Sequence, residues 1–121
     1  MAQSDSRTTH TATIAAAGSL SAAVKLGGGQ LVGIISPGTF DANTTNLQFH
    51  VSIDGTNYFL LKDMNAAAPV IAIVAATNAH RAHWFGEQFR GFNYVKVGTY
   101  KTDATTVQTQ TAEKVFTLIT R

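Results

Sequence analysis

Hydrophobic and polar residues alternate strictly through residues 47–53, and this is the clearest pattern in the chain. Such alternation is the period of a strand that has one buried face. Asp54-Gly55 follows, a dipeptide that readily adopts the positive φ angles of a tight hairpin turn. Apolar residues resume at 58–61, so residues 47–61 predict an antiparallel β-hairpin. The apolar positions of its first strand are Leu47, Phe49, Val51 and Ile53.

Short apolar segments of the same kind recur along the rest of the chain, separated by turn-forming residues. None of them sustains a helical period for more than a turn or two. Strand candidates with turn signals at this spacing are typical of β-sandwiches and jelly rolls. Further strands are expected at 12–17, 20–26, 30–36, 69–75 and 92–99, with one long or two short strands in 107–121.

These patterns predict a single all-β domain over residues 14–121, an antiparallel β-sandwich of jelly-roll type with about eight strands. Residues 1–13 are polar and patternless, and we expect them to form a flexible N-terminal arm. The predicted core contains Leu47, Phe49, Val51, Ile53, Ile71, Ile73, Val95 and Val97.

Two of the expected strands, residues 30–36 and 69–75, are apolar on both faces. In a two-layer sandwich each strand has one buried face and one wet face. A loop could cover the second face of such a strand, or another copy of the chain could pack against it. The second interpretation predicts a homo-oligomer, because a small sandwich cannot cover both faces by itself.

The composition argues against several classes of partner and site. Only 13% of the 121 residues are charged, against about 25% in an average domain, and the net charge is +2. The lysines lie far apart, so no cluster of cations is available to neutralise phosphates and no nucleic acid partner is expected. The absence of cysteine excludes disulfides and thiolate metal sites. Because neither a signal-peptide pattern nor a membrane-length apolar run occurs, we expect synthesis in a cytoplasm and no membrane partner.

Residues suited to catalysis or metal binding are sparse. Gly27-Gly28-Gly29 lacks the Gly-Lys-Ser/Thr that completes a phosphate loop, and we interpret it as a bend between strands. His80 and His83 have a spacing that converges only on a helix, and no carboxylate stands at ligand spacing. We therefore expect no enzymatic activity, no metal and no cofactor. The aspartates in predicted turns, where Asp caps local backbone donors, are Asp41, Asp54, Asp63 and Asp103.

Residues 80–94 carry about half of the aromatic side chains of the chain. The segment could close one open end of the sandwich. It could also form a contact surface, since Trp, Tyr and Arg carry most of the energy of protein interfaces. The candidate interface residues are Arg81, Trp84, Phe85, Phe89, Arg90, Phe92 and Tyr94.

Several motifs occur in a familiar order. Residues 49–55 read Phe-x-Val-Ser-x-Asp-Gly, Tyr58 follows, and residues 61–63 read Leu-x-Asp. The Tyr-Val-Lys-Val strand at 94–97 and the strand at 118–121 complete the set. This arrangement resembles small virion structural proteins of tailed bacteriophages that decorate or cement capsids, and it covers residues 20–121. The Ser-x-Asp-Gly hairpin and the Tyr-Val-Lys-Val strand also recur in discoidin-like, carbohydrate-binding jelly rolls.

The resemblance implies a jelly roll on the exterior of a virion capsid, without enzymatic activity. Such a protein bridges subunits of the major capsid protein, commonly as a homotrimer at local three-fold positions. Two alternatives remain open at this point: a structural protein of a phage tail or neck, and a carbohydrate-binding adhesin. The adhesin would present Tyr58, Trp84 or Tyr100 on a loop surface to stack on a sugar ring.

Overall fold

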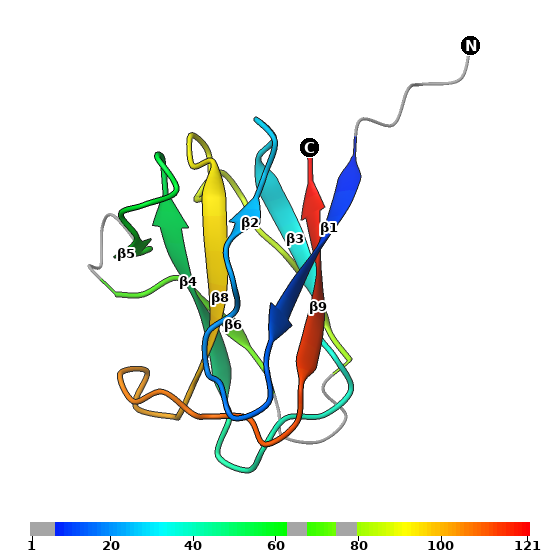
Figure 1. The fold of residues 1–121 in the computed structure, drawn as a ribbon, viewed down its shortest axis with the longest axis vertical. Coiled ribbons are helices and arrows are strands. Elements are labelled where there is room, and N and C mark those ends of the chain that lie inside the picture. Colours follow the sequence, from blue (N-terminus) through cyan, green and yellow to red (C-terminus); the bar gives the residue numbers. More distant parts are fainter. Residues whose placement is uncertain (1–6, 63–67, 75–79) are drawn as a thin grey trace.

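Two antiparallel sheets pack face to face in the computed structural model, which describes residues 7–62, 68–74 and 80–121 (Figure 1). The first sheet has the strand order β1 (Thr8–Ile14), β9 (Lys114–Thr120), β3 (Leu31–Ile35) and β7 (Ala82–Trp84). The second sheet has the order β2 (Val24–Lys25), β8 (Tyr94–Tyr100), β4 (Asn46–Ser52) and β5 (Phe59–Leu60), with β6 (Ile71–Ile73) also paired to β4. The prediction of an all-β antiparallel sandwich is confirmed. A search of the described residues for a helix that could span a bilayer finds none.

Strands β5 and β6 lie along the same side of β4, one at each half of its length. Val51 pairs with Phe59 in β5, and Leu47 pairs with Ala72 in β6. An isolated bridge joins Lys62, which follows β5, to Pro69, which precedes β6. The two short strands therefore together form one edge of the second sheet.

The hairpin predicted at 47–61 is present as β4 and β5, but its turn is longer than two residues. Gly55 adopts a φ of 79°. The Asp54 carboxylate accepts hydrogen bonds from the backbone N–H groups of Thr56 and Asn57, at 2.8 and 2.9 Å. Asp54 thus organises a wide loop between the two strands.

The core lies between the sheets and is dominated by alternate residues of β4, β8 and β9. The predicted core positions that are buried are Leu47, Phe49, Val51, Val95 and Val97. The prediction is wrong for Ile53, Ile71 and Ile73, whose side chains are exposed. Ile53 is 67% exposed because β4 ends at Ser52 and the chain has already begun to turn.

The error in β6 has a different cause, namely the register of the strand. Residues directly opposite each other in an antiparallel pair share a face. Since Ala72 lies opposite the inward-facing Leu47, Ala72 points into the core and its neighbours Ile71 and Ile73 point out. A segment that is apolar on both sides does not reveal by itself which of its residues point into the core.

The prediction of a flexible arm over residues 1–13 is wrong for residues 8–13, because residues 8–14 form β1. Residues 1–6 lie outside the described residues. Strand β1 pairs with β9 over seven residues, from Thr8 opposite Thr120 to Ile14 opposite Lys114. Ala12 and Ile14 enter the core, and the other side of the strand is threonine. Long-range pairing therefore makes a strand out of a sequence that looks polar and patternless.

Candidate interaction surfaces

The aromatic segment 80–94 divides between core and surface. Phe89 is completely buried and packs edge-on against Phe49, with ring centroids 5.1 Å apart. Phe85 contacts both rings, at 5.2 Å from Phe49 and 4.8 Å from Phe89. These residues close the interior of the sandwich, as one of the two interpretations of the segment expected.

Trp84 has the opposite position, since its side chain is 63% exposed. It lies in β7 directly opposite Gly33 of β3. A Cβ added to Gly33 would lie 3.0 Å from Cε3 of the indole, so the ring lies flat over the glycine. The missing side chain at Gly33 is what allows Trp84 to rest on the sheet rather than stand away from it.

The other candidate interface residues do not gather around Trp84. Arg81 and Arg90 are exposed, and Arg90 forms an ion pair of 3.4 Å with Glu87. Phe92 and Tyr94 are half-buried. Tyr94 points to the outer face of the second sheet, where its ring packs against Gly55. The structure therefore does not assemble the seven residues into one continuous patch.

Trp84 and several other apolar residues lie on the side of the first sheet that points away from the second sheet. We call this side the outer face of the first sheet. The registers place Gly33 opposite Ile119 and Ile35 opposite Thr117, with Val115 two residues further along β9. Ile35 and Val115 are exposed, and Ile119 is partly exposed. Within the described part of the chain, no third layer pairs or packs over this face.

The sequence interpretation identified Trp84 but missed Ile35 and Val115. A signal for Val115 exists in the alternation of residues 114–120, where one side consists of Val115, Thr117 and Ile119. No comparable signal exists for Ile35, because residues 31–35 are apolar on both sides. A bulge between Leu31 and Gly33 shifts the phase of β3 and turns Ile35 outward.

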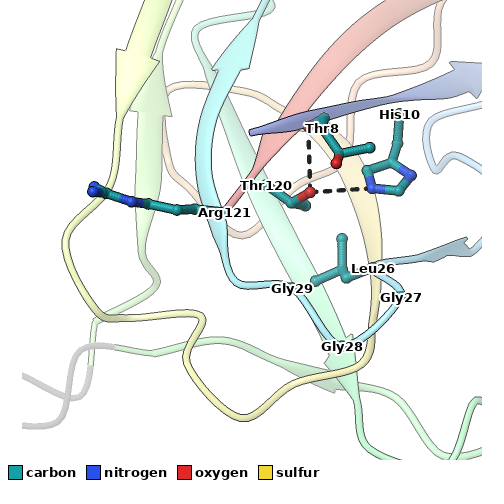
Figure 2. A pocket seen from close by; sticks show the side chains of 8 residues that line it. All are labelled: Thr8, His10, Leu26, Gly27, Gly28, Gly29, Thr120 and Arg121. Atoms are coloured by element: carbon teal, nitrogen blue, oxygen red, sulfur yellow. Dashed lines mark hydrogen bonds between the residues drawn. The ribbon is translucent and has the colours of Figure 1, made fainter. Parts of the chain in front are cut away.

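A shallow polar cavity of about 380 Å³ opens at the end of the sandwich near β1 and the glycine loop (Figure 2). Its polar side chains come from β1 and the end of β9. Thr120 Oγ1 donates to the carbonyl of Thr8 at 3.3 Å and lies 3.2 Å from His10 Nε2. Among the described residues that line the cavity, none has a carboxylate side chain.

A second hollow, of about 230 Å³, lies beside the β4–β5 hairpin and is mostly apolar. Ile53, Phe59 and Phe92 line it, together with Asp54. Hydrogen bonds from Asn57, Thr56 and Ser52 lower the pKa of Asp54 far below its usual value. These internal donors occupy the carboxylate, so it has little capacity left for a ligand.

Hydrogen bonds also occupy the other aspartates that the structure describes. Thr111 donates its backbone N–H and its hydroxyl to Asp41, at 2.8 and 2.6 Å, and these bonds lower the Asp41 pKa. Hydrogen bonds from Thr106 and Thr105 lower the pKa of Asp103 to about 2. The prediction that these side chains cap local backbone donors is confirmed for Asp54 and Asp103. It is wrong for Asp41, whose partner Thr111 lies 70 residues away in the chain. Asp63 lies outside the described residues.

The histidines are separated from one another. His50 lies 2.9 Å from the Tyr100 hydroxyl on the outer face of the second sheet, and burial lowers its pKa. His83 faces inward from β7 opposite Ile34, and burial lowers its pKa too. Among the described residues, no group of three or more His, Asp or Glu side chains could hold a metal ion.

The aromatic residues considered for sugar stacking are not equally available. Tyr100 is buried, and Tyr58 is half-buried beneath the Lys96 ammonium, which lies 4.3 Å from its ring centroid. Trp84 is exposed, but it stands on a strand rather than on a loop. Comparison with protein-family models, with curated proteins and with solved structures finds no match to this chain.

Proposed function

We propose that this chain is a non-enzymatic virion structural protein that decorates and cements a phage capsid by bridging subunits of the major capsid protein. The outer face of the first sheet is the observation that carries the proposal. It presents the exposed side chains of Trp84, Ile35 and Val115 on one side of a hydrogen-bonded sheet. The resemblance of residues 20–121 to decoration proteins supplies the nature of the partner, and it places the protein on the capsid exterior after synthesis in the host cytoplasm.

The chemistry of this face suits protein docking. An exposed tryptophan that shares a sheet face with β-branched residues has the character of an interface anchor, which is commonly Trp, Tyr or Arg. The same face carries Thr9, Thr11 and Thr13 of β1 and Thr117 of β9, so it is nearly free of charge. We therefore expect affinity from apolar contacts and backbone hydrogen bonds, with a weak dependence on salt.

The fold proposed for this role is a jelly roll. With β5 and β6 counted together as one edge strand, each sheet has four strands. Successive strands of the chain alternate between the sheets, except that β4 and this edge strand both belong to the second sheet. Strand β9 lies between β1 and β3, and β8 lies between β2 and β4. This order supports the two interlocked Greek keys of a jelly roll.

The surroundings of the aromatic residues favour decoration over the adhesin alternative. Sugar stacking needs an open aromatic face on a loop, and the positions of Tyr58 and Tyr100 do not offer one. A glycan array tests the alternative directly, and strong selective binding there would support the adhesin instead.

The test of the proposed function is to mix the protein with expanded, undecorated capsids and to image them. We expect regular density on the exterior at symmetry-related positions. Density only at a tail or neck, or no binding, would refute the cement function and leave the fold unchanged. A tail location would favour the structural alternative named above.

Two substitutions separate the docking face from the rest of the surface. Trp84→Ser removes the central anchor, and a loss of about 2 kcal/mol would weaken capsid binding roughly 30-fold. Phe59→Ser is the matched control, because Phe59 is equally exposed but lies at the edge of the second sheet. Equal effects of both substitutions would show that the outer face of the first sheet is not the docking surface.

The proposal includes self-association, which the resemblance places in a homotrimer. Density at local three-fold positions of the shell would support the trimer. Light scattering of the free protein measures the stoichiometry independently.

A further inference from the structure

We propose that two copies of this chain pair through the free edge of β1, in an antiparallel register that is centred on Thr11. The pairing would join the two first sheets into one sheet of eight strands. This inference concerns how the protein associates with itself, and it does not depend on what the protein decorates. It predicts a two-fold pair in place of the homotrimer that the resemblance implies.

Among the described residues, no other strand pairs with the edge of β1 that faces away from β9. The ladder shows which backbone groups point to this edge. Arg121 and Gln30 exchange both backbone hydrogen bonds, at 2.9 and 3.0 Å, so Arg121 faces the β3 side. Bonding direction alternates along a strand. Thr120 and Leu118 therefore face β1, and their partners Thr8 and His10 use their backbone groups in that ladder.

The hydrogen bonds between β3 and β7 confirm independently which backbone groups face which neighbouring strand. The carbonyl of Val32 accepts from the N–H of Phe85, and the N–H of Ser36, just after β3, donates to the carbonyl of Arg81, so both residues face the β7 side. Gly33 and Ile35 must then face β9, where they lie opposite Ile119 and Thr117. Continuing the alternation across β9 leaves the N–H and C=O groups of Thr9, Thr11 and Thr13 directed at the free edge.

These three residues are complementary to themselves. In an antiparallel pair centred on Thr11, Thr9 of one copy lies opposite Thr13 of the other, and Thr11 lies opposite Thr11. All three pairs join residues whose backbone groups face the edge, so each pair exchanges two hydrogen bonds. Threonines on one face of neighbouring strands are favourable cross-strand partners. The strand TTHTATI carries no Asp, Glu, Lys or Arg, so like charges do not oppose the pairing.

β1 also lacks the features that protect sheet edges. Such edges are commonly kept short, bulged, or marked with lysine or proline. The other edge strands described here are two or three residues long, and β2 contains Lys25. β1 has seven residues, no proline, no lysine and an unbroken register with β9. Among the described edge strands, β1 is therefore the one best suited to pair with another strand. The β1 strand of a second copy is such a partner.

The chain has no cysteine, so engineered cysteines test the register cleanly. Directly paired residues lie about 5.5 Å apart between Cα atoms, within reach of a disulfide. Under mild oxidation we expect Thr11→Cys to form a covalent dimer, and an equimolar mixture of Thr9→Cys and Thr13→Cys to form a mixed dimer. Thr9→Cys alone should cross-link poorly, because its copies would lie about 14 Å apart along the strand. Cross-linking of Thr11→Cys no faster than of Thr9→Cys would overturn the proposal.

Association without a covalent bond supplies the second measurement. Pairing of seven residues buries less than a standard interface of about 800 Å² per partner, so we expect dissociation constants on the order of 100 µM. Sedimentation equilibrium at high concentration should show species of twice the 12.8 kDa chain mass. A protein that stays monomeric at millimolar concentration, or that forms trimers instead, would overturn the proposal.

Two further variants remove the pairing and preserve the fold. Thr11→Pro deletes an N–H that faces the free edge, so the β1–β9 ladder stays complete. Thr11→Lys places two ammonium groups opposite each other at the centre of the pair. Thr117→Lys is the matched control, since Thr117 shares the same face beside Thr11 but lies in the central strand β9. We expect dimerisation to weaken at least 10-fold for the two Thr11 variants and to stay unchanged for Thr117→Lys. Unchanged dimerisation of both Thr11 variants would refute the proposed edge. Circular dichroism verifies that each variant is folded.

Discussion

Substitution of two phenylalanines in one hairpin tests the orientation of β4 and β5. Phe49 in β4 is 0% exposed, whereas Phe59 in β5 is 69% exposed. Phe49 also makes two edge-on ring contacts, with Phe85 and Phe89. We expect Phe49→Ala to destabilise the fold strongly and Phe59→Ala to have little effect.

The structure sets the size of both effects. Removing a fully buried phenylalanine leaves a cavity and costs about 3–5 kcal/mol in the free energy of unfolding. Full burial of such a side chain contributes about 1.5–3 kcal/mol, and Phe59 buries only about a third of its surface, so its loss costs about 0.5–1 kcal/mol. For a chain of this length, about 4 kcal/mol corresponds to a shift of roughly 15 °C in the melting temperature.

Urea titration followed by circular dichroism gives the free energy of unfolding of each variant. Domains of this size are stable by about 5–15 kcal/mol, so Phe49→Ala could leave little folded protein. Phe49→Leu, with an expected cost below about 1.5 kcal/mol, keeps the comparison measurable. Equal losses for Phe49→Ala and Phe59→Ala, or a larger loss for Phe59→Ala, would refute the orientation and with it the assigned faces of the second sheet.

Gln110→Leu should lower the free energy of unfolding by about 3 kcal/mol, because the buried amide accepts from Asp41 N–H at 2.8 Å and donates to Thr44 Oγ1 at 2.9 Å. Urea titration measures this loss, and a loss below about 1 kcal/mol would contradict the prediction. Gly33→Ala should push the indole of Trp84, the single tryptophan, off the sheet, and unchanged fluorescence would contradict this. Burial lowers the pKa of His50 below its ordinary 6.5, so stability should be complete above pH 6.5 and fall as the pH drops below it. His50→Gln should reduce that slope, and an identical pH profile would contradict the assignment.

The sequence predicted those parts of the fold that local chemistry determines. Alternation identified the inward face of β4 through Leu47, Phe49 and Val51. It failed at Ile53, since Ser52 Oγ accepts from the N–H of Gly55 at 2.9 Å and starts the turn there. The alternation of residues 47–53 does not indicate where the hydrogen-bonded ladder of β4 ends.

The first part of strand β1, residues 8–11, was missed because the partner that makes it a strand is more than 100 residues away in the chain. The strand predicted at 12–17 overlaps only the last three residues of β1. Thr8 pairs with Thr120, and the two inward residues Ala12 and Ile14 are too few to give a local signal. Pairing between two strands that lie so far apart in the chain depends on the topology of the whole fold and not on the local sequence. The apolar face around Trp84 was missed in part for the same reason, since the exposure of Ile35 depends on a bulge in β3.

The two proposed surfaces reinforce each other in one geometry. If β1 pairs with its copy, the joined sheet has β7 at both ends, seven strand spacings apart, or about 34 Å at about 4.8 Å per spacing. Trp84 would stand near each end of the joined sheet, so one dimer would present two separate anchors. Because neighbouring strands twist by about 20–25°, the two anchors point in different directions and would engage different subunits of the shell. Two anchors in one dimer bind a repeating shell with an avidity that can exceed a single contact by about 10²–10⁴. Thr11→Pro should therefore weaken capsid binding although Thr11 lies far from Trp84, and a variant that binds capsids as tightly as the unaltered protein would show that bridging does not require the pair.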